Sequence, residues 1–446
     1  MEKLNAKLKI IFPGIILVIM CCNRVMSQKT NGNKAHVLSK VNIKAINEEE
    51  LRKGNKTIAI IGATLIDGNG GPSLTDACVV VQGNKIMAVG KNGTIEVPRN
   101  AEIMDAKGLY LLPGLIDAHF HLDEVKKLPH HFLLNGVTSV RDPGQWIEIY
   151  NEERAFGYPL PRLFLTGPHL DMPPPAYPND AYIVRDAEEA IKAVNKFADQ
   201  GATAIKIYFR IPLGMMEKIC TAAHKRGLPV TTHLELLDAR EAIIAGVDGI
   251  EHVTSLGISL SPALKAEQYK QAVLADNNAR RKGRYEVWRS LNMNSQNVDS
   301  LVTFLKEHQT FLSPTLAIFE YRLGNGKDDT AQWSGFKNMM AFVGKARKGG
   351  VRVVVGSHSI VPYATKGWAY HREMELMAES GISTAEIIVA ATMENARFFR
   401  ISDRLGSIEK GKLADLILVK ENPLSDIKAM RKIHKVMLNG VWISPD

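Results

Sequence analysis

The chain has 446 residues, of which 45% are hydrophobic and 23% charged, with 35 glycines and 20 prolines. This composition is typical of a folded globular protein and excludes a disordered, collagen-like or coiled-coil chain. The formal net charge of +9 is spread over interleaved basic and acidic side chains, so we expect no nucleic-acid partner.

The N-terminus differs in pattern from the rest of the chain. Three lysines in the first nine residues precede an apolar run at residues 10–22. This order predicts a secretory signal peptide over residues 1–27, and therefore an exported protein, periplasmic or extracellular. The run is shorter than the roughly 20 residues that span a bilayer, so we expect no membrane span. Cys21 and Cys22 leave a lipid anchor open as an alternative.

Eight short apolar runs alternate with segments of helical spacing through the middle of the chain. Eight strands that alternate with helices predict an α/β protein with a closed parallel (β/α)8 barrel, which we assign to residues 113–404. Two of the helices have capping signals. Asp186 can cap residues 187–200, with Glu189 completing a capping box, and Ser383 with Glu386 opens a helix that runs toward Phe398. The eight runs are residues 114–119, 137–142, 162–166, 204–209, 229–233, 249–253, 311–315 and 352–357.

The two flanks of the barrel are rich in short strands and Asp-Gly, Gly-Asn and Asn-Gly turns. They predict one small β-sandwich built from both chain ends, residues 57–112 plus 405–446. The polar stretch at residues 265–300 predicts a helical insertion or lid over the barrel. Within it, the basic cluster at residues 280–284 is expected to form a solvated helix face.

Four histidines stand where barrel strands end. His119 and His121 are two residues apart, so on a strand both imidazoles point to the same side and can hold one metal ion. His233 and His252 each follow another apolar run, at the end where barrel enzymes keep their active sites. Together the four predict a metal centre.

Lys206 lies in the middle of an apolar strand, where a charged amine is costly unless it is paired or modified. Two interpretations stay open. The amine meets a carboxylate, or it adds carbon dioxide and becomes a carbamate whose oxygens can bridge two cations.

Five segments resemble the amidohydrolase superfamily of metal-dependent hydrolases, in particular its imidazolonepropionase-like and Xaa-Pro-dipeptidase-like members. The resemblance covers most of the chain, and the segments that contain histidine carry the functional part of it. The segments are IGATLIDG at 61–68, LPGLIDAHFH at 112–121, GVTSVRD at 136–142, GATAIKIY at 201–208 and DRLGSIEKGKLAD at 403–415.

This resemblance implies a (β/α)8 barrel with a β-sandwich and one or two divalent ions, usually zinc. His119 and His121 would bind the more buried ion, His233 and His252 the outer one, and Lys206, as N6-carboxylated lysine, would bridge them. The implied reaction is hydrolysis of a C–N bond, in an amide, a peptide or a cyclic amide, by a metal-activated water. The substrate would be a small molecule or a short peptide, and a homo-oligomer stays open.

One departure from the family pattern concerns the eighth strand. Family members end it with a Gly-Thr-Asp-like turn whose Asp takes the proton from water, whereas this chain has His358 in the sequence GSHS at 356–359. A neutral imidazole can bind metal or accept a proton, but it brings no negative charge. Two hypotheses follow. In one, the site works with His358 as catalytic residue or with help from Glu235 or Glu251; in the other, it is degenerate and the protein only binds a ligand.

Three residues are candidate substrate contacts. Tyr208 and Arg210 follow Lys206 at even spacing and share its face if the strand continues. His169 follows the third strand, at the rim where loops determine specificity. Asp142 ends the second strand, where we expect a structural hydrogen bond.

Overall fold

The computed structural model describes residues 42–324 and 330–444. All of these described residues belong to one compact unit. The predicted signal peptide, residues 1–27, and the alternative lipid anchor lie outside the described residues. Among the described helices, none is both long and apolar enough to cross a membrane.

Eight short parallel strands form the centre of this unit, and each of the eight predicted apolar runs contains one. All their residues except Arg352 are buried, as expected for strands covered on both faces. The strands are β6 (Leu115–Asp117), β7 (Val137–Asp142), β8 (Arg162–Leu165), β11 (Ile205–Ile207), β12 (Val230–Thr232), β13 (Gly249–Glu251), β14 (Phe311–Ser313) and β15 (Arg352–Val353).

Hydrogen bonds close these strands into a ring. β6, β7 and β8 pair in one sheet, and β11 to β15 pair in another. At one seam Thr203 N donates to Leu165 O at 2.7 Å, and at the other Ala118 N donates to Val355 O at 3.0 Å. The predicted (β/α)8 barrel is therefore confirmed.

Two further strands extend the third barrel strand at its C-terminal end. β9 (His169–Asp171) follows β8 closely and pairs with β11, and β10 (Ala181–Ile183) pairs with β9. The sequence did not predict them. They place His169 and the loop at 172–180 beside the C-terminal mouth of the barrel.

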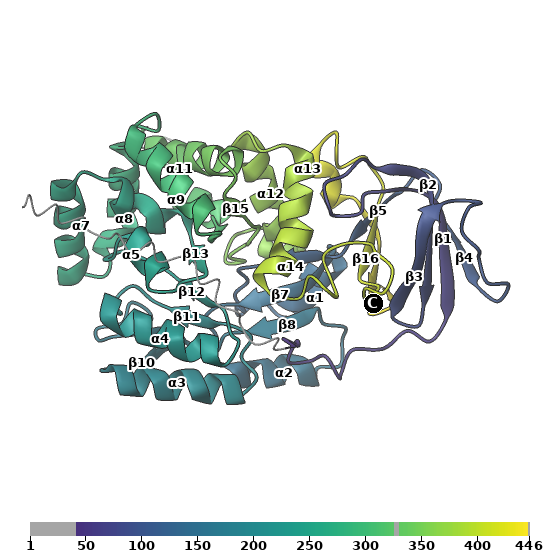
Figure 1. Cartoon of the computed structure of the whole chain (residues 1–446), viewed down its shortest axis with the longest axis horizontal. Coiled ribbons are helices and arrows are strands. Elements are labelled where there is room, and N and C mark those ends of the chain that lie inside the picture. Colours follow the sequence, from purple (N-terminus) through teal and green to yellow (C-terminus); the bar gives the residue numbers. More distant parts are fainter. Residues whose placement is uncertain (1–41, 325–329, 445–446) are drawn as a thin grey trace, which may run out of the picture. The chain divides into compact units, whose positions relative to one another are not determined.

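Helices connect the barrel strands and pack their apolar faces against them in one hydrophobic core. In Figure 1, α3 and α4 lie on one side of the strands, and α11 and α12 on the other. The helices are α1 (Leu128–Leu134), α2 (Tyr150–Ala155), α3 (Ala187–Asp199), α4 (Leu213–Lys225), α5 (Ala239–Ile244), α6 (Gly257–Leu260), α7 (Ala263–Ala275), α8 (Ala279–Arg289), α9 (Gln296–Glu307), α10 (Leu316–Arg322), α11 (Thr330–Lys348), α12 (Ala369–Glu379), α13 (Thr384–Val389) and α14 (Asn395–Phe398).

The two predicted helix starts are correct, but only one capping box forms. Ser383 N donates to the carboxylate of Glu386, and Glu386 N donates to Ser383 Oγ, which is the reciprocal pair of a capping box. At α3, Asp186 accepts from the first turn as expected, whereas the carboxylate of Glu189 accepts from Arg185 N, one residue too early. A short π-helix, Ala390–Glu394, joins α13 to α14, so the helix runs to Phe398.

Strands from both ends of the described chain form a single eight-stranded sheet. β5 pairs with β1 on one side and with β16 on the other, where Leu112 faces Ile417; in Figure 1 these strands lie beside one another in purple and yellow. The boundaries 57–112 and 405–446 stay a prediction. The strands are β1 (Thr57–Leu65), β2 (Leu74–Gln82), β3 (Lys85–Lys91), β4 (Glu102–Asp105), β5 (Tyr110–Pro113), β16 (Leu416–Val419), β17 (Ile433–Leu438) and β18 (Val441–Ile443).

The polar stretch at residues 265–300 is helical, as predicted. It contributes most of α7, all of α8 and the start of α9, between β13 and β14. We call α7 and α8 the helical insertion.

Candidate metal centre

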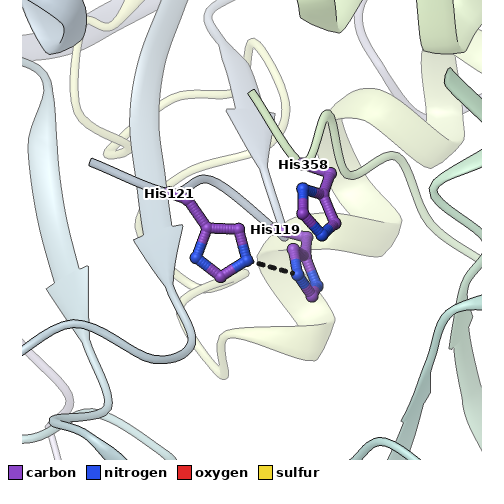
Figure 2. A group of neighbouring side chains, drawn as sticks. All are labelled: His119, His121 and His358. Carbon is purple, nitrogen blue, oxygen red and sulfur yellow. Dashed lines mark hydrogen bonds between the residues drawn. The ribbon is translucent and has the colours of Figure 1, made fainter. Parts of the chain in front are cut away.

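Three imidazoles meet at the C-terminal mouth of the barrel. His119 and His121 follow β6, and His358 follows β15. One ligand nitrogen of each ring lies within 4.8 Å of the other two, and the Nε2 atoms of His119 and His121 are 3.0 Å apart (Figure 2). Two nitrogens bound to one tetrahedral zinc ion at about 2.0–2.1 Å are roughly 3.4 Å apart. The pair therefore already has nearly the spacing of two ligands of one ion.

Carboxylates behind the first two imidazoles determine which nitrogen faces the cavity. Nδ1 of His119 lies 2.6 Å from Oε2 of Glu251, and Nδ1 of His121 lies 3.6 Å from Oδ1 of Asp142. An imidazole whose Nδ1–H donates a hydrogen bond keeps the lone pair on Nε2, and metal-binding histidines use that lone pair. Asp142 also accepts from Tyr150 OH at 2.8 Å, which confirms its structural hydrogen bond.

The turn after β15 is bonded directly to the histidine motif after β6. His358 N donates to His119 O at 2.6 Å, and Ser359 Oγ donates to His121 O at 2.6 Å. A Cβ at Gly356 would lie 2.7 Å from Cβ of His119, so this close approach requires glycine. His358 and Ser359 have φ values of 59° and 39°, a strained region that persists where the surroundings fix it. The turn thus holds the His358 ring on the cluster.

The other three predicted metal ligands lie around the same mouth. The ring of His252 is 4.6 Å from the rings of His119 and His233. Nδ1 of His252 lies 2.6 Å from Thr315 Oγ1, so its Nε2 is left for another partner. Nδ1 of His233 and Nζ of Lys206 are buried without a hydrogen-bond partner among the described residues. Such atoms are costly to bury. A bound cation would satisfy the His233 nitrogen, whereas the Lys206 amine would have to lose its proton or be carboxylated first.

Burial keeps the imidazoles in the neutral form that binds cations and weakens the basicity of Lys206. It lowers the pKa of His119 to about 4 and that of His233 to about 3, although the neighbouring carboxylates of Glu251 and Glu235 oppose each shift. Burial also lowers the pKa of Lys206 to about 8. Metal ligands must be deprotonated, so neutral imidazoles and a weakly basic lysine suit a metal centre.

A cavity of about 280 Å³ opens over the imidazoles. Its volume is close to the lower end of the range of about 300–1,000 Å³ that small-molecule sites occupy. Two of the predicted substrate contacts, His169 and Tyr208, line it, and their rings are 4.4 Å apart. Nε2 of His169 is buried without a hydrogen-bond partner among the described residues. The contact of His169 and Tyr208 with substrate stays a prediction, which their position in the cavity lining allows.

The third predicted substrate contact, Arg210, faces away from the cavity. Its Nε and Nη2 donate to Oδ1 of Asn277 at 3.1 and 2.7 Å, and Nη2 donates to Val273 O at 3.2 Å. The alternation of faces that motivated the prediction stops where β11 ends, at Ile207. Arg210 therefore contacts the helical insertion and does not line the cavity, and its contact with substrate stays a prediction.

Sequence reasoning missed the arginines of the cavity wall. Arg284 of α8 and Arg322 of α10 line the cavity, and Arg280 lies one turn before Arg284. The expected solvated face is wrong for Arg280 and Arg284, whose exposed fractions are 1% and 4%, although Arg281 and Lys282 between them are exposed. Residues four apart share one helix face, and this spacing was the signal in the sequence.

Neither glutamate proposed to help His358 is free in the described structure. Glu235 Oε1 accepts from Arg284 Nε at 2.7 Å and lies 2.8 Å from His233 Nε2, while Glu251 is bonded to His119. Neither lines the cavity.

The cavity-lining carboxylates among the described residues are Asp123 and Asp180. Asp123 is exposed and accepts from Glu124 N. Asp180 is half-buried in the loop before β10, and within the described chain its side chain forms no hydrogen bond. Burial raises the pKa of Asp180, which makes it a stronger base than an ordinary carboxylate.

The profile of the amidohydrolase family matches residues 110–443, which include every residue of this site. The chain belongs to the amidohydrolase family. Among curated relatives of this amidohydrolase, N-acyl-D-aspartate deacylase of Alcaligenes xylosoxydans xylosoxydans is 41% identical over 85 residues, 18% of this chain and 16% of that protein. Dihydroorotase of Lactococcus lactis subsp. lactis (strain IL1403) is 36% identical over 66 residues, 15% of each. The chain thus matches less than a fifth of the length of these relatives.

Solved amidohydrolase structures match the fold over most of the chain. A Xaa-Pro dipeptidase with methionine bound in its active site aligns with a TM-score of 0.68 at 24% identity, over 87% of this chain and 100% of that chain. A putative prolidase from Bifidobacterium longum aligns with a TM-score of 0.67 at 25% identity, over 87% and 95%. The family resemblance and the predicted fold, a barrel with a β-sandwich, are confirmed.

Proposed function

We propose that this amidohydrolase hydrolyses a C–N bond, in an amide, a peptide or a cyclic amide, at a metal centre built on His119, His121 and His358. The observation that carries the proposal is the spacing of these imidazoles, whose ligand nitrogens lie within 4.8 Å of one another. The names of the relatives, a deacylase, a dihydroorotase and a dipeptidase, support a small-molecule or short-peptide substrate.

The side chains present fit a divalent ion such as zinc. Neutral imidazole nitrogens are ordinary zinc ligands, and the carboxylate behind His119 is the usual partner of such a ligand. Nδ1 of His233, Nε2 of His252 and Nζ of Lys206 would serve a second ion. Lys206 as a carbamate would offer an oxygen to each ion, and its buried, unpartnered Nζ supports this role.

A divalent ion supplies Lewis acidity, which lowers the pKa of water and polarises a carbonyl group. The protein's own groups supply orientation and proton transfer. His169 and Tyr208 line the cavity beside the cluster and offer hydrogen bonds to a substrate. Asp180 lines it as well. Of the two cavity-lining carboxylates described, it is the one whose side chain forms no hydrogen bond, so we assign to it the role of accepting a proton from water.

His358 takes a ligand position in this proposal. Its nitrogen belongs to the cluster of three, and the hydrogen bond from its own backbone to His119 O fixes the ring there. The position that holds a proton-accepting Asp in the family pattern thus contributes an uncharged ligand. Another residue must therefore act as the general base, and we propose Asp180 for this role.

The test combines metal content with turnover. We expect bound zinc by elemental analysis, and hydrolysis of at least one compound in a panel of dipeptides, N-acyl amino acids and cyclic amides. His121→Asn should lose both metal and turnover, whereas His434→Asn, an exposed histidine of β17, should change neither. Absence of bound metal in the wild-type protein as produced, and after zinc supplementation, would contradict the proposal.

Proton transfer is tested separately at Asp180 and His358. Asp180→Asn should lower kcat roughly 10²–10⁴-fold, the usual contribution of a general base, while metal content stays the same. His358→Asp should preserve or raise kcat, because it restores a carboxylate at this position. A large loss in His358→Asp with normal kcat in Asp180→Asn would assign the proton transfer to His358 instead.

A second candidate function is a binding protein with an inactive site. The observation that favours it is the histidine at position 358 in place of an acidic residue. This second function predicts that the protein binds metal but hydrolyses no compound of the panel. It also predicts that neither Asp180→Asn nor His358→Asp gains turnover.

A further inference from the structure

One side of the cavity carries three arginines, Arg280, Arg284 and Arg322, which we call the arginine wall. Arg280 and Arg284 belong to α8 of the helical insertion, and Arg322 ends α10. Arg284 and Arg322 line the cavity, while Arg280 lies behind Tyr177, with its guanidinium carbon 5.1 Å from the centre of that ring. Three positive charges thus surround one side of a small cavity.

Arg284 is neutralised within the protein. Its Nε donates to Oε1 of Glu235 at 2.7 Å, and both side chains are buried. Tyr269 OH of α7 also donates to Glu235, so the carboxylate connects both helices of the insertion to the end of β12. A buried ion pair of this kind contributes little net charge to the cavity.

The other two arginines have no such partner. Among the described residues, no carboxylate forms an ion pair with Arg280 or with Arg322. Arg280 is 1% exposed, so its charge is largely removed from water. A buried charge is costly unless an opposite charge compensates it. The wall therefore carries two positive charges that no carboxylate of the described residues balances, a buried one on Arg280 and an exposed one on Arg322.

The surplus charge acts on the cavity itself. Tyr177 lines the cavity, and although burial would raise its pKa, the charges of Arg280, Arg322 and Arg284 lower it. The field at this point of the cavity is thus positive before any ligand binds.

The arginine wall adjoins the metal centre, because Nη2 of Arg284 lies 3.1 Å from Nε2 of His233. The centre of the Phe319 ring is 5.8 Å from the guanidinium carbon of Arg284, 5.9 Å from that of Arg322 and 5.9 Å from the ring of His252. A small molecule in the cavity can therefore contact the wall with one end and the histidines with the other.

We propose that the arginine wall selects acidic substrates, by binding a carboxylate on the part of the substrate that leaves after hydrolysis, with Arg322 as the residue that contacts it. This inference rests on the proposed hydrolysis and adds the substrate class. Arg322 contacts the carboxylate because it lines the cavity and has no partner among the described residues. The second surplus charge, on Arg280, favours a dianion over a monoanion through the field at Tyr177.

The test compares three substrates of nearly equal size with charges of −2, −1 and 0: N-acetylglutamate, N-acetylglutamine and N-acetylglutamine amide. We expect kcat/KM to fall in that order. Arg322→Gln should raise KM for the two anions roughly 10–100-fold, the usual effect of losing a hydrogen bond to a charged group, and leave the neutral amide unchanged. Arg322→Lys should recover part of the loss. Arg281→Gln, which changes an exposed arginine of α8, is the control and should behave as wild type.

Binding is measured independently of turnover by calorimetric titration of the protein as purified with glutamate, N-acetylglutamate and N-acetylglutamine amide. The acidic compounds should bind and lose affinity in Arg322→Gln. Equal affinity for acidic and neutral compounds, or an unchanged affinity in Arg322→Gln, would contradict the proposed binding of a carboxylate by the arginine wall. This holds whether or not the protein is a hydrolase. Binding without turnover of any compound would instead contradict the proposed hydrolysis and leave the wall intact.

Discussion

The two sides of the cavity are built in different ways. The histidine cluster lies on the ends of barrel strands, where backbone hydrogen bonds such as that from His358 N to His119 O fix each side chain. The arginine wall lies on α8 and α10, outside the strand framework, and one buried carboxylate, Glu235, connects α8 to the barrel.

This difference separates two functions of the site. Strand ends are rigid, so they suit a metal centre whose ligands must keep their geometry to within a few tenths of an ångström. Helices between strands can differ in length and sequence while the barrel persists, so they suit the recognition of substrates. We therefore expect changes in the cluster to affect metal and turnover, and changes in the wall to affect stability and KM.

The largest expected effect is that of removing the metal. Chelation should abolish turnover, and added zinc should restore it. Loss of an ion present at about 100 times its Kd costs roughly 2.7 kcal/mol of folding free energy, so the melting temperature should fall as well. Elemental analysis, activity and thermal unfolding check this, and full turnover by metal-free protein would contradict the role of the cluster.

The next effect concerns the connection between wall and barrel. Glu235→Gln leaves the buried Arg284 without a counter-charge, which typically costs about 3–5 kcal/mol of folding free energy. Urea unfolding measures it. Glu286→Gln on the same helix removes an exposed pair with Arg289 and should cost far less. If both variants lost the same folding free energy, the buried pair of Glu235 and Arg284 would stabilise the protein no more than an exposed pair does.

A smaller effect is expected behind the cluster. Glu251→Gln weakens the hydrogen bond that orients His119, and such changes typically reduce metal affinity about 10–100-fold. Competition with a chromophoric zinc chelator measures the affinity. Glu241→Gln, on the exposed side of α5, is the control. Unchanged affinity in Glu251→Gln would argue against His119 as a ligand.

The smallest effect tests the turn after β15. Ser359→Ala removes a hydroxyl that accepts from His121 N and donates to His121 O, at a cost of about 1 kcal/mol of folding free energy. Ser383→Ala, in a capping box distant from the site in sequence, costs a similar amount. Only Ser359→Ala should also reduce metal affinity. A reduction in both variants would show that affinity merely follows stability.

The sequence was sufficient to predict that His119, His121, His233 and His252 lie at one mouth of the barrel, because their signals are local, whereas it gave His358 a catalytic role. Each ligand sits at the end of a short apolar run, and parallel strands of a barrel bring such ends to one mouth. The arginine wall has no local signal of this kind, since Arg284 and Arg322 come from separate helices whose packing no short pattern encodes. The sequence did not show that Arg210 lies beyond β11 for a related reason, because the end of β11 is not marked in the sequence.

The pairing of β5 with β16 imposes an order on biosynthesis. Leu112 and its partner Ile417 are separated by nearly the whole barrel in the chain, so one edge of β5 has no neighbour until the ribosome has made the last strands. Contacts of such long separation form late, and an open strand edge is prone to intermolecular pairing in the meantime. A nascent chain that stalls before residue 416 should therefore depend on chaperones far more than one released at full length.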